Sequence, residues 1–214
     1  TMSLMKYPKK TANLPSIARH LKEVGYGTKY YYGGDADFTN MRSYLVSQGI
    51  NDIVSDMSFP VKDRMSKWGV PDDKLFERLK ADLKDDRIGT PMLRIIQTSS
   101  SHEPFDVPYN RLADERLNAF AFADSCIGNF VSALKASPQW KSSLVILLPD
   151  HQGCWPIGIS NEDLGHYHIP MIWTGGALAK GGEVDIIGSQ QDLAATLLGQ
   201  LNINHDDMLF SKDM

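Results

Sequence analysis

Helical and strand periodicities alternate along the whole chain, and this alternation restricts the fold more than any other feature. The short apolar stretches typical of strands lie at residues 28–32, 92–97, 144–148 and 169–174. Helical spacing of apolar residues covers 15–25, 39–49, 71–83, 112–135 and 193–201, and residues 51–70 indicate a long connection. The pattern predicts an α/β protein with a mostly parallel, helix-covered central sheet. We take residues 1–214 as a single domain.

Several element ends carry recognisable signals. Gly25 and Gly49 are expected to end the first two helices, and Thr39 to cap the second. Ser189 and Asp192 form a variant of the capping box at the last helix. The long helix is expected to pack through Phe120, Ala123, Ile127, Val131 and Leu134.

Composition excludes some classes of function. The net charge is −4 and no cluster of basic residues occurs beyond Lys9 and Lys10, so a nucleic-acid partner is not expected. The longest apolar runs have about six residues, far fewer than the roughly 20 that a membrane helix needs. The two cysteines, Cys126 and Cys154, form no metal-binding pair motif.

The dipeptide Asp150-His151 directly follows the apolar run at 144–149. Ligands of parallel α/β sheets bind beyond the carboxyl ends of the strands, where these two side chains lie. Both can face one cation in the turn after the strand, and a carboxylate with an imidazole suits zinc or manganese better than calcium or magnesium. The alternative is a turn that only caps the next segment.

Two further polar segments could contribute to a site. His102 lies in the loop after the strand at 92–97 and could stabilise charge or transfer a proton, or could simply be a surface residue. Asp163, His166 and His168 precede the strand at 169–174 and could complete a metal shell. The GxSxG, P-loop, GxGxxG and HExxH motifs are absent from the sequence, which removes support for serine-hydrolase and nucleotide-binding functions.

A series of short segments, taken in order, resembles a sulfatase-type domain of the alkaline phosphatase superfamily, in its lipoteichoic acid synthase and phosphoglycerol transferase branch. These segments are 14–17, 68–70, 100–105, 123–130, 149–151, 169–173 and 189–193. The resemblance implies an alkaline phosphatase-like three-layer α/β sandwich. It also implies an extracytoplasmic metalloenzyme with a membrane-anchored parent, in which a threonine hydroxyl attacks a phosphate or sulfate ester of a lipid or glycan head group.

By the same resemblance, Asp150 and His151 would bind a divalent metal, manganese or zinc, and His102 would contact the substrate. Asp124 matches a recurrent position of structural role. Phosphate esters are preferred over sulfate esters, because the formylglycine motif is matched only by a misplaced segment starting at Cys154.

The chain also departs from the family pattern. The family's nucleophile and first acidic ligand precede the segment at 14–17, so the sequence predicts a C-terminal portion that lacks its first strands. Neither Thr1 nor Thr11 follows a strand, so neither is favoured as the nucleophile. Gln152 replaces the small residue usual after Asp-His, and Arg42 only partly matches a phosphate-binding cluster.

The resulting hypothesis is a metal-dependent phosphate-ester hydrolase or transferase, inactive as this chain alone, whose exposed sheet edges favour self-association. One alternative is a non-catalytic α/β binding module that retains the fold. Another is a metallophosphatase with its whole metal shell drawn from Asp150, His151, Asp163, His166 and His168.

Overall fold

The computed structural model of the chain describes residues 2–85, 90–153, 155 and 157–214. Its residues form two compact units. The first comprises Thr1–Leu75, Asp82–Ser99 and Asp185–Met214, and the second comprises Phe76–Ala81 and Ser100–Val184. We describe each unit by itself, and the assignment of residues 1–214 to one domain stays a prediction.

A parallel sheet of three strands forms the centre of the first unit. Its strands are β1 (Gly27–Tyr32), β2 (Asp52–Val54) and β3 (Met92–Gln97), in the order β2-β1-β3. Tyr30 of β1 is aligned with Ile53 on one side and Ile95 on the other. Residues 51–70, predicted as a connection, therefore contain the strand β2. The sequence did not predict this strand, because three residues are too few to show a periodicity. The α/β class with a central parallel sheet is confirmed.

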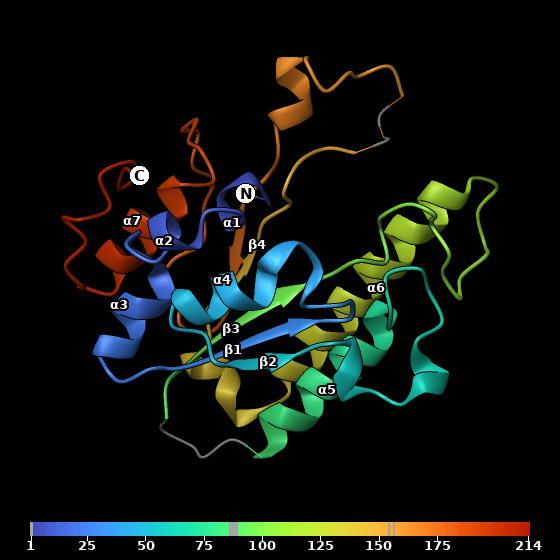
Figure 1. The fold of residues 1–214 in the computed structure, drawn as a ribbon, viewed down its shortest axis with the longest axis horizontal. Coiled ribbons are helices and arrows are strands. Elements are labelled where there is room, and N and C mark those ends of the chain that lie inside the picture. The colour runs from blue at the N-terminus through green and yellow to red at the C-terminus, as the bar shows by residue number, and fades with distance from the viewer. Residues whose placement is uncertain (1, 86–89, 154, 156) are drawn as a thin grey trace. The chain divides into compact units, whose positions relative to one another are not determined.

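Helices flank this sheet on both faces (Figure 1). Those of the first unit are α1 (Met2–Met5), α2 (Pro8–Thr11), α3 (Ile17–Glu23), α4 (Met41–Ser47) and α7 (Asp192–Gln200), with 3-10 turns at Phe38–Asn40, Asp56–Ser58 and Val61–Asp63. Tyr30 and Tyr32 pack with Met41 of α4 in one buried cluster. Tyr31 points to the opposite face, as the alternation of side chains along a strand requires, and donates a hydrogen bond to Asp82 of α5 (Asp72–Asp85).

The helix ends agree only in part with the sequence signals. Gly25 and Gly49 have positive φ angles of 94° and 92° directly after α3 and α4, as a glycine stop requires. Thr39 does not cap α4, because it lies before the cap position with φ 54°. Asn40 holds that position with φ 63°, and its side chain makes no capping hydrogen bond. At α7, Asp192 accepts a hydrogen bond from the backbone N–H of Ser189, so this part of the predicted capping box is present.

The segment at 66–70 is held directly against the end of β1. Val70 donates a backbone hydrogen bond to the carbonyl of Gly33, 2.9 Å long. A Cβ atom on Gly33 would lie 2.3 Å from the carbonyl oxygen of Val70, a separation that real structures do not show. Glycine is therefore required here by the close approach of two backbones.

The second unit combines a long helix with a small antiparallel sheet. Its elements are α6 (Glu115–Lys135), β4 (Val145–Leu147) and β5 (Ile172–Thr174), with 3-10 turns at Pro138–Ser142 and Leu164–Tyr167. Ile146 is aligned with Trp173 in antiparallel register, so these two strands do not follow the parallel pattern expected from sequence.

The buried face of α6 differs from the predicted stripe. Its fully buried apolar residues are Ala119, Phe122, Ala123, Cys126, Phe130 and Leu134, whereas Phe120, Ile127 and Val131 are half-buried. Phe130 packs against Phe76, with ring centroids 5.4 Å apart. The helix is apolar over more than one face, so spacing alone did not determine which face is buried.

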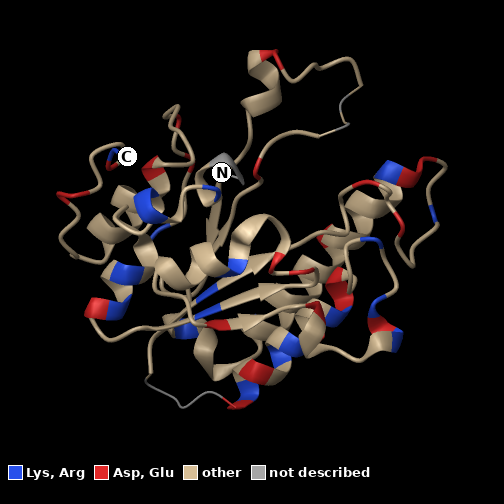
Figure 2. Ribbon diagram, viewed as in Figure 1, with Lys and Arg blue, Asp and Glu red and all other residues tan. Residues whose placement is uncertain are grey.

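Two surface properties bear on the expected partners. Acidic and basic residues are interspersed along α5 (Figure 2), in keeping with the modest net charge. Within the described ranges, α6 is the one helix whose length and composition would suffice to cross a membrane, although 39% of its most apolar window is buried. Core helices of water-soluble proteins meet the same criterion.

Candidate metal and substrate site

Asp150 and His151 lie immediately beyond β4, in the loop that follows the strand. The backbone N–H of His151 donates a 3.0 Å hydrogen bond to Oδ1 of Asp150. The ring atom Nε2 of His151 lies 3.5 Å from Oδ2 of the same carboxylate. Both side chains are open to solvent, with 50% of the imidazole and 88% of the carboxylate exposed. The prediction that they follow the strand together is met, and both can be reached from outside.

The distance between these two atoms can be compared with metal coordination geometry. Zinc lies about 2.1 Å from a histidine nitrogen or a carboxylate oxygen, so two neighbouring ligands are about 3.0 Å apart at a right angle and about 3.4 Å apart at the tetrahedral angle. The observed separation of Nε2 and Oδ2 is 3.5 Å. The pair therefore fits one divalent cation with a shift of a few tenths of an ångström. A carboxylate and an imidazole are also the correct donors for manganese or zinc.

The other ring nitrogen of His151 has its own partner. Nδ1 lies 2.6 Å from the backbone carbonyl oxygen of Gln152. Because a carbonyl oxygen can only accept, Nδ1 carries the proton in this hydrogen bond. The lone pair of the neutral ring is then on Nε2, the nitrogen beside Asp150.

The segment at 163–168 contacts this pair, although it does not add ligands to it. His166 is buried, with 6% of its surface exposed, and its ring stacks on that of His151 with centroids 5.2 Å apart and an interplanar angle of 21°. The carboxylate of Asp163 accepts a hydrogen bond from the backbone of Ser160. Within the described part of the chain, no three His, Cys, Asp or Glu side chains are grouped to hold a metal ion. This structure therefore does not support a shell drawn from Asp150, His151, Asp163, His166 and His168.

His102 lies in the second unit, in the loop that follows β3. It is exposed, and its Nδ1 is 3.0 Å from the carbonyl oxygen of Glu103. Phe105 closes the turn by donating its backbone N–H to the carbonyl of His102, and its φ of 62° is unusual for a bulky residue. The loop thus has a defined local conformation with the imidazole open to solvent.

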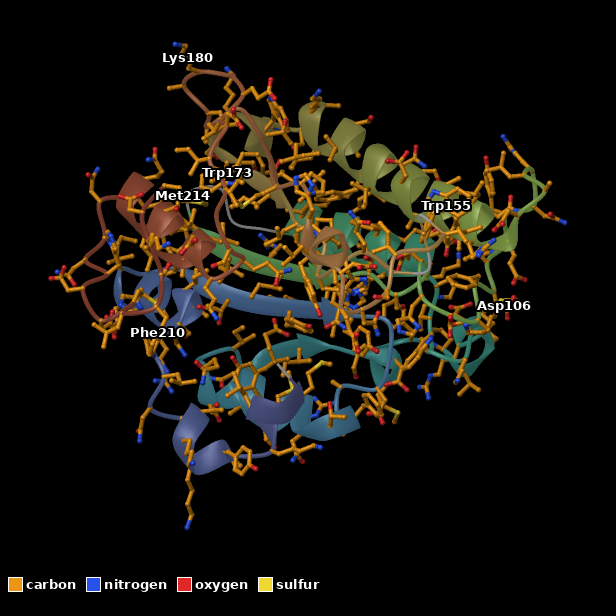
Figure 3. The ribbon with its side chains drawn as sticks, turned by 90° about the horizontal axis from the view of Figure 1, so that it is seen from above. Asp106, Trp155, Trp173, Lys180, Phe210 and Met214 are labelled. Carbon is orange, nitrogen blue, oxygen red and sulfur yellow. The ribbon has the colours of Figure 1, made fainter. Side chains whose placement is uncertain are left out.

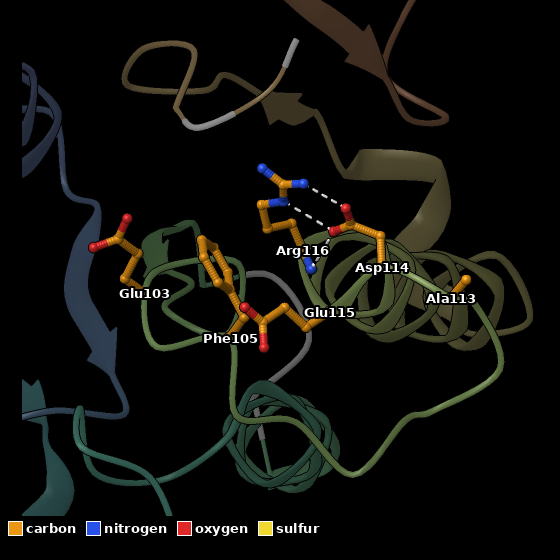
Figure 4. A pocket seen from close by; sticks show the side chains of 6 residues that line it. All are labelled: Glu103, Phe105, Ala113, Asp114, Glu115 and Arg116. Carbon is orange, nitrogen blue, oxygen red and sulfur yellow. Dashed lines mark hydrogen bonds and ion pairs between the residues drawn. The ribbon is translucent and has the colours of Figure 1, made fainter. Parts of the chain in front are cut away.

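A pocket of about 500 Å³ lies beside this loop, between it and the start of α6 (Figure 4). Its lining residues are Glu103, Phe105, Ala113, Asp114, Glu115 and Arg116. Nε of Arg116 donates to Oδ1 of Asp114 over 2.9 Å, and hydrogen bonds from Arg116 lower the pKa of Asp114 to about 2. The guanidinium also lies 5.5 Å from the ring centre of Trp155, which is labelled in Figure 3. The sequence analysis missed this pocket, although the acidic and basic residues Asp114 to Arg116 at a helix start were a possible signal.

The remaining residues singled out from sequence have ordinary structural environments. Asp124 is exposed on α6, and Arg42 forms an ion pair with Asp37 at 2.7 Å. The Thr11 hydroxyl is buried and donates to backbone carbonyls of its own helix region, at 3.2 Å for that of Pro8. Thr1 and Cys154 lie outside the described residues.

Comparison with known proteins extends over most of the chain. The Sulfatase family model matches residues 1–203. The chain belongs to the sulfatase family. This sulfatase-family chain is 27% identical over 207 residues to phosphoglycerol transferase I of Xanthomonas axonopodis pv. citri (strain 306), a match covering 85% of the chain and 28% of the relative. It is 26% identical over 153 residues to the protein of the same name from Xanthomonas campestris pv. campestris (strain B100), covering 63% of the chain and 21% of that relative.

Solved structures show the same fold. A protein in the alkaline phosphatase superfamily from Vibrio parahaemolyticus superimposes with a TM-score of 0.84 at 27% identity, covering 98% of the sulfatase-family chain and 52% of the other. The lipoteichoic acid synthase LtaP from Listeria monocytogenes gives a TM-score of 0.82 at 22% identity, with 96% and 58% covered. The chain thus spans roughly half the length of these structures and about a quarter of the curated relatives. The expected resemblance to this superfamily is confirmed.

Proposed function

We propose that this sulfatase-family chain supplies the Asp-His part of a divalent metal site to an enzyme that hydrolyses or transfers phosphate esters. The supporting observation is the 3.5 Å separation between Nε2 of His151 and Oδ2 of Asp150, which fits two ligands of one ion. The family match restricts the chemistry to ester transfer or hydrolysis, and relatives named phosphoglycerol transferase I favour phosphate over sulfate.

A bound manganese or zinc ion would supply Lewis acidity at the reacting oxygen atoms. Asp150 contributes negative charge to the site, and His151 presents a neutral nitrogen while its Nδ1 proton is held by the carbonyl of Gln152. His102 can present an imidazole to a substrate or leaving-group oxygen, because its ring is exposed on a turn with a defined backbone.

The proposed substrate is a phosphate ester carried by a lipid or glycan head group, and the proposed setting is the outer side of a membrane to which the whole protein is anchored. The names of the relatives, phosphoglycerol transferase I and lipoteichoic acid synthase LtaP, support the substrate class, whereas the setting follows only from the resemblance found in the sequence. The nucleophilic hydroxyl and a further acidic ligand are proposed to come from a part of the whole protein outside these 214 residues. The chain by itself should accordingly show little or no turnover, and its sheet edges favour self-association.

The test compares the 214-residue chain with a longer protein that extends upstream of it. Both are assayed for p-nitrophenol release from bis(p-nitrophenyl) phosphate and p-nitrophenyl sulfate, with and without manganese. We expect metal-dependent turnover of the phosphodiester by the longer protein alone, and its loss in Asp150→Ala and His151→Ala. Asp124→Ala is the matched control, because that carboxylate is exposed on α6.

Two results would contradict the proposal. Turnover by the longer protein that is unchanged in both ligand variants would show that the Asp-His pair does not hold the catalytic ion. Absence of turnover together with equal manganese binding by wild type and both variants would favour the alternative of a non-catalytic binding module that retains the fold.

A further inference from the structure

The residue that follows the Asp-His pair is anchored to the 163–168 turn at two points. The backbone N–H of Gln152 donates a 3.0 Å hydrogen bond to the carbonyl of His166. Its side-chain Nε2 donates a 2.7 Å hydrogen bond to the carbonyl of His168. Gln152 is thus held through its backbone N–H and through its side chain. Its carbonyl oxygen, which belongs to the next peptide group, accepts from Nδ1 of His151.

The same turn supports the imidazole of His151 through its face. The His166 ring lies nearly parallel to it, and the edge of the Tyr167 ring meets His166 at 84° with centroids 4.9 Å apart. A ring nitrogen binds a metal ion in the plane of its own ring. Because the two rings are stacked and nearly parallel, an ion in the plane of the His151 ring lies outside the plane of the His166 ring. His166 is therefore placed to support His151 and not to share its ion. The backbone N–H of His166 donates to the carbonyl of Asp163, which keeps the turn closed.

Two buried polar atoms in this arrangement make no hydrogen bond in the described structure, namely Nδ1 of His166 and Oε1 of Gln152. A buried polar group without a partner costs roughly 1–3 kcal/mol, so such atoms call for an explanation. Nδ1 of His166 can donate, and Oε1 of Gln152 can only accept. The two residues are already joined by a backbone hydrogen bond. Their complementarity is consistent with one water molecule or a small shift joining them.

We propose that Gln152 and His166 are positioning residues that fix the His151 imidazole, in both its orientation and its Nδ1–H tautomer, so that Nε2 faces the ion held with Asp150. The inference rests on the proposed function for the identity of the ion, and it concerns this chain's own residues. Outer partners of metal-binding histidines fix the tautomer and ring direction, and their loss typically weakens metal affinity about 10–100-fold.

The first experiment needs no metal. Long-range ¹⁵N NMR spectra of histidine-labelled chain report the tautomer of His151 directly. We expect the Nδ1–H form in the wild type, and a mixture of tautomers in His166→Ala and in Gln152→Gly. His166→Phe should retain the wild-type tautomer, since a phenyl ring preserves the stack. His168→Ala is the matched control, because its side chain is exposed on the same turn and its contact with Gln152 is made by the backbone carbonyl.

The second experiment measures manganese binding by the electron paramagnetic resonance signal of the free ion, in the same variants of the longer protein that extends upstream, because a further acidic ligand is proposed to lie outside the 214 residues. We expect affinity to fall about 10-fold or more in His166→Ala and Gln152→Gly, and to change less than about 3-fold in His166→Phe and His168→Ala. Melting curves identify any variant that fails to fold. Such a variant is set aside, and the positioning role is then judged from the variants that do fold.

The outcomes separate the two proposals. A wild-type tautomer in both His166→Ala and Gln152→Gly would overturn the positioning role, as would equal losses in His166→Ala and His168→Ala. A locked tautomer without any manganese binding beyond that of Asp150→Ala would instead contradict the proposed metal site, and leave the positioning of the ring established.

Discussion

Replacing Asp82 by alanine tests the polar group that joins α5 to the central sheet. Oδ2 of Asp82 accepts hydrogen bonds from Nζ of Lys29 and from the hydroxyl of Tyr31, each 2.9 Å long. Only 17% of the Asp82 side chain and 15% of the Lys29 side chain are exposed. Tyr31 is completely buried. The substitution would therefore remove a charged acceptor from two donors that have little access to water.

The size of the effect follows from these environments. A hydrogen bond to a charged group contributes about 1.5–3 kcal/mol when its loss leaves a buried donor. Lys29 keeps a second partner, Asp52 at 3.1 Å, so the larger cost of isolating a buried charge is not incurred. We expect Asp82→Ala to lower the free energy of unfolding by about 2–3 kcal/mol. Asp52→Ala should cost less than about 1 kcal/mol, because 60% of that side chain is exposed.

Urea denaturation at pH 7, followed by circular dichroism, measures both variants. With a denaturant slope of about 2 kcal/mol per molar, Asp82→Ala should lower the midpoint by about 1–1.5 M and Asp52→Ala by less than about 0.5 M. Hydrogen exchange of the β1 amides would assign the loss to the first unit. Equal midpoint shifts for the two variants would refute the reasoning, since burial would then not determine the cost of losing a carboxylate.

Three further predictions concern packing and charge. Gly33→Ala should destabilise the chain by more than about 1 kcal/mol in urea denaturation, because its Cβ would lie 2.3 Å from the carbonyl oxygen of Val70; an unchanged midpoint would contradict this close approach. Leu198→Ala, in a fully buried position, should cost about 2–5 kcal/mol in the same assay, and a cost below about 1 kcal/mol would argue against its burial. The lowered pKa of Asp114, about 2 against an ordinary value of about 3.9, means that its contribution to stability is present above about pH 4 and lost as the pH falls towards 2. Carboxyl NMR titration should show this pKa rising towards its ordinary value in Arg116→Ala, and an unchanged titration would exclude Arg116 as the cause.

The sequence predicted the features that depend on neighbouring residues. The strand at 92–97 coincides with β3, and glycine marks the ends of α3 and α4 where the backbone takes a positive φ. An apolar run followed by Asp150 and His151 was enough to place both side chains just beyond a strand. Each of these signals is local, because a short stretch of residues determines its own periodicity, its turn and its polarity.

Only the tertiary structure decided the features that depend on distant partners. The three residues of β2 become a strand by pairing with β1, and α6 buries the face that carries Phe122 and Phe130 because Phe76 packs against it. The support of His151 by Gln152 and His166 joins residues about 15 positions apart, through backbone carbonyls that have no sequence signature. Sequence thus indicated which groups are candidates to hold an ion, while long-range packing determined which contacts surround one of them, the His151 imidazole.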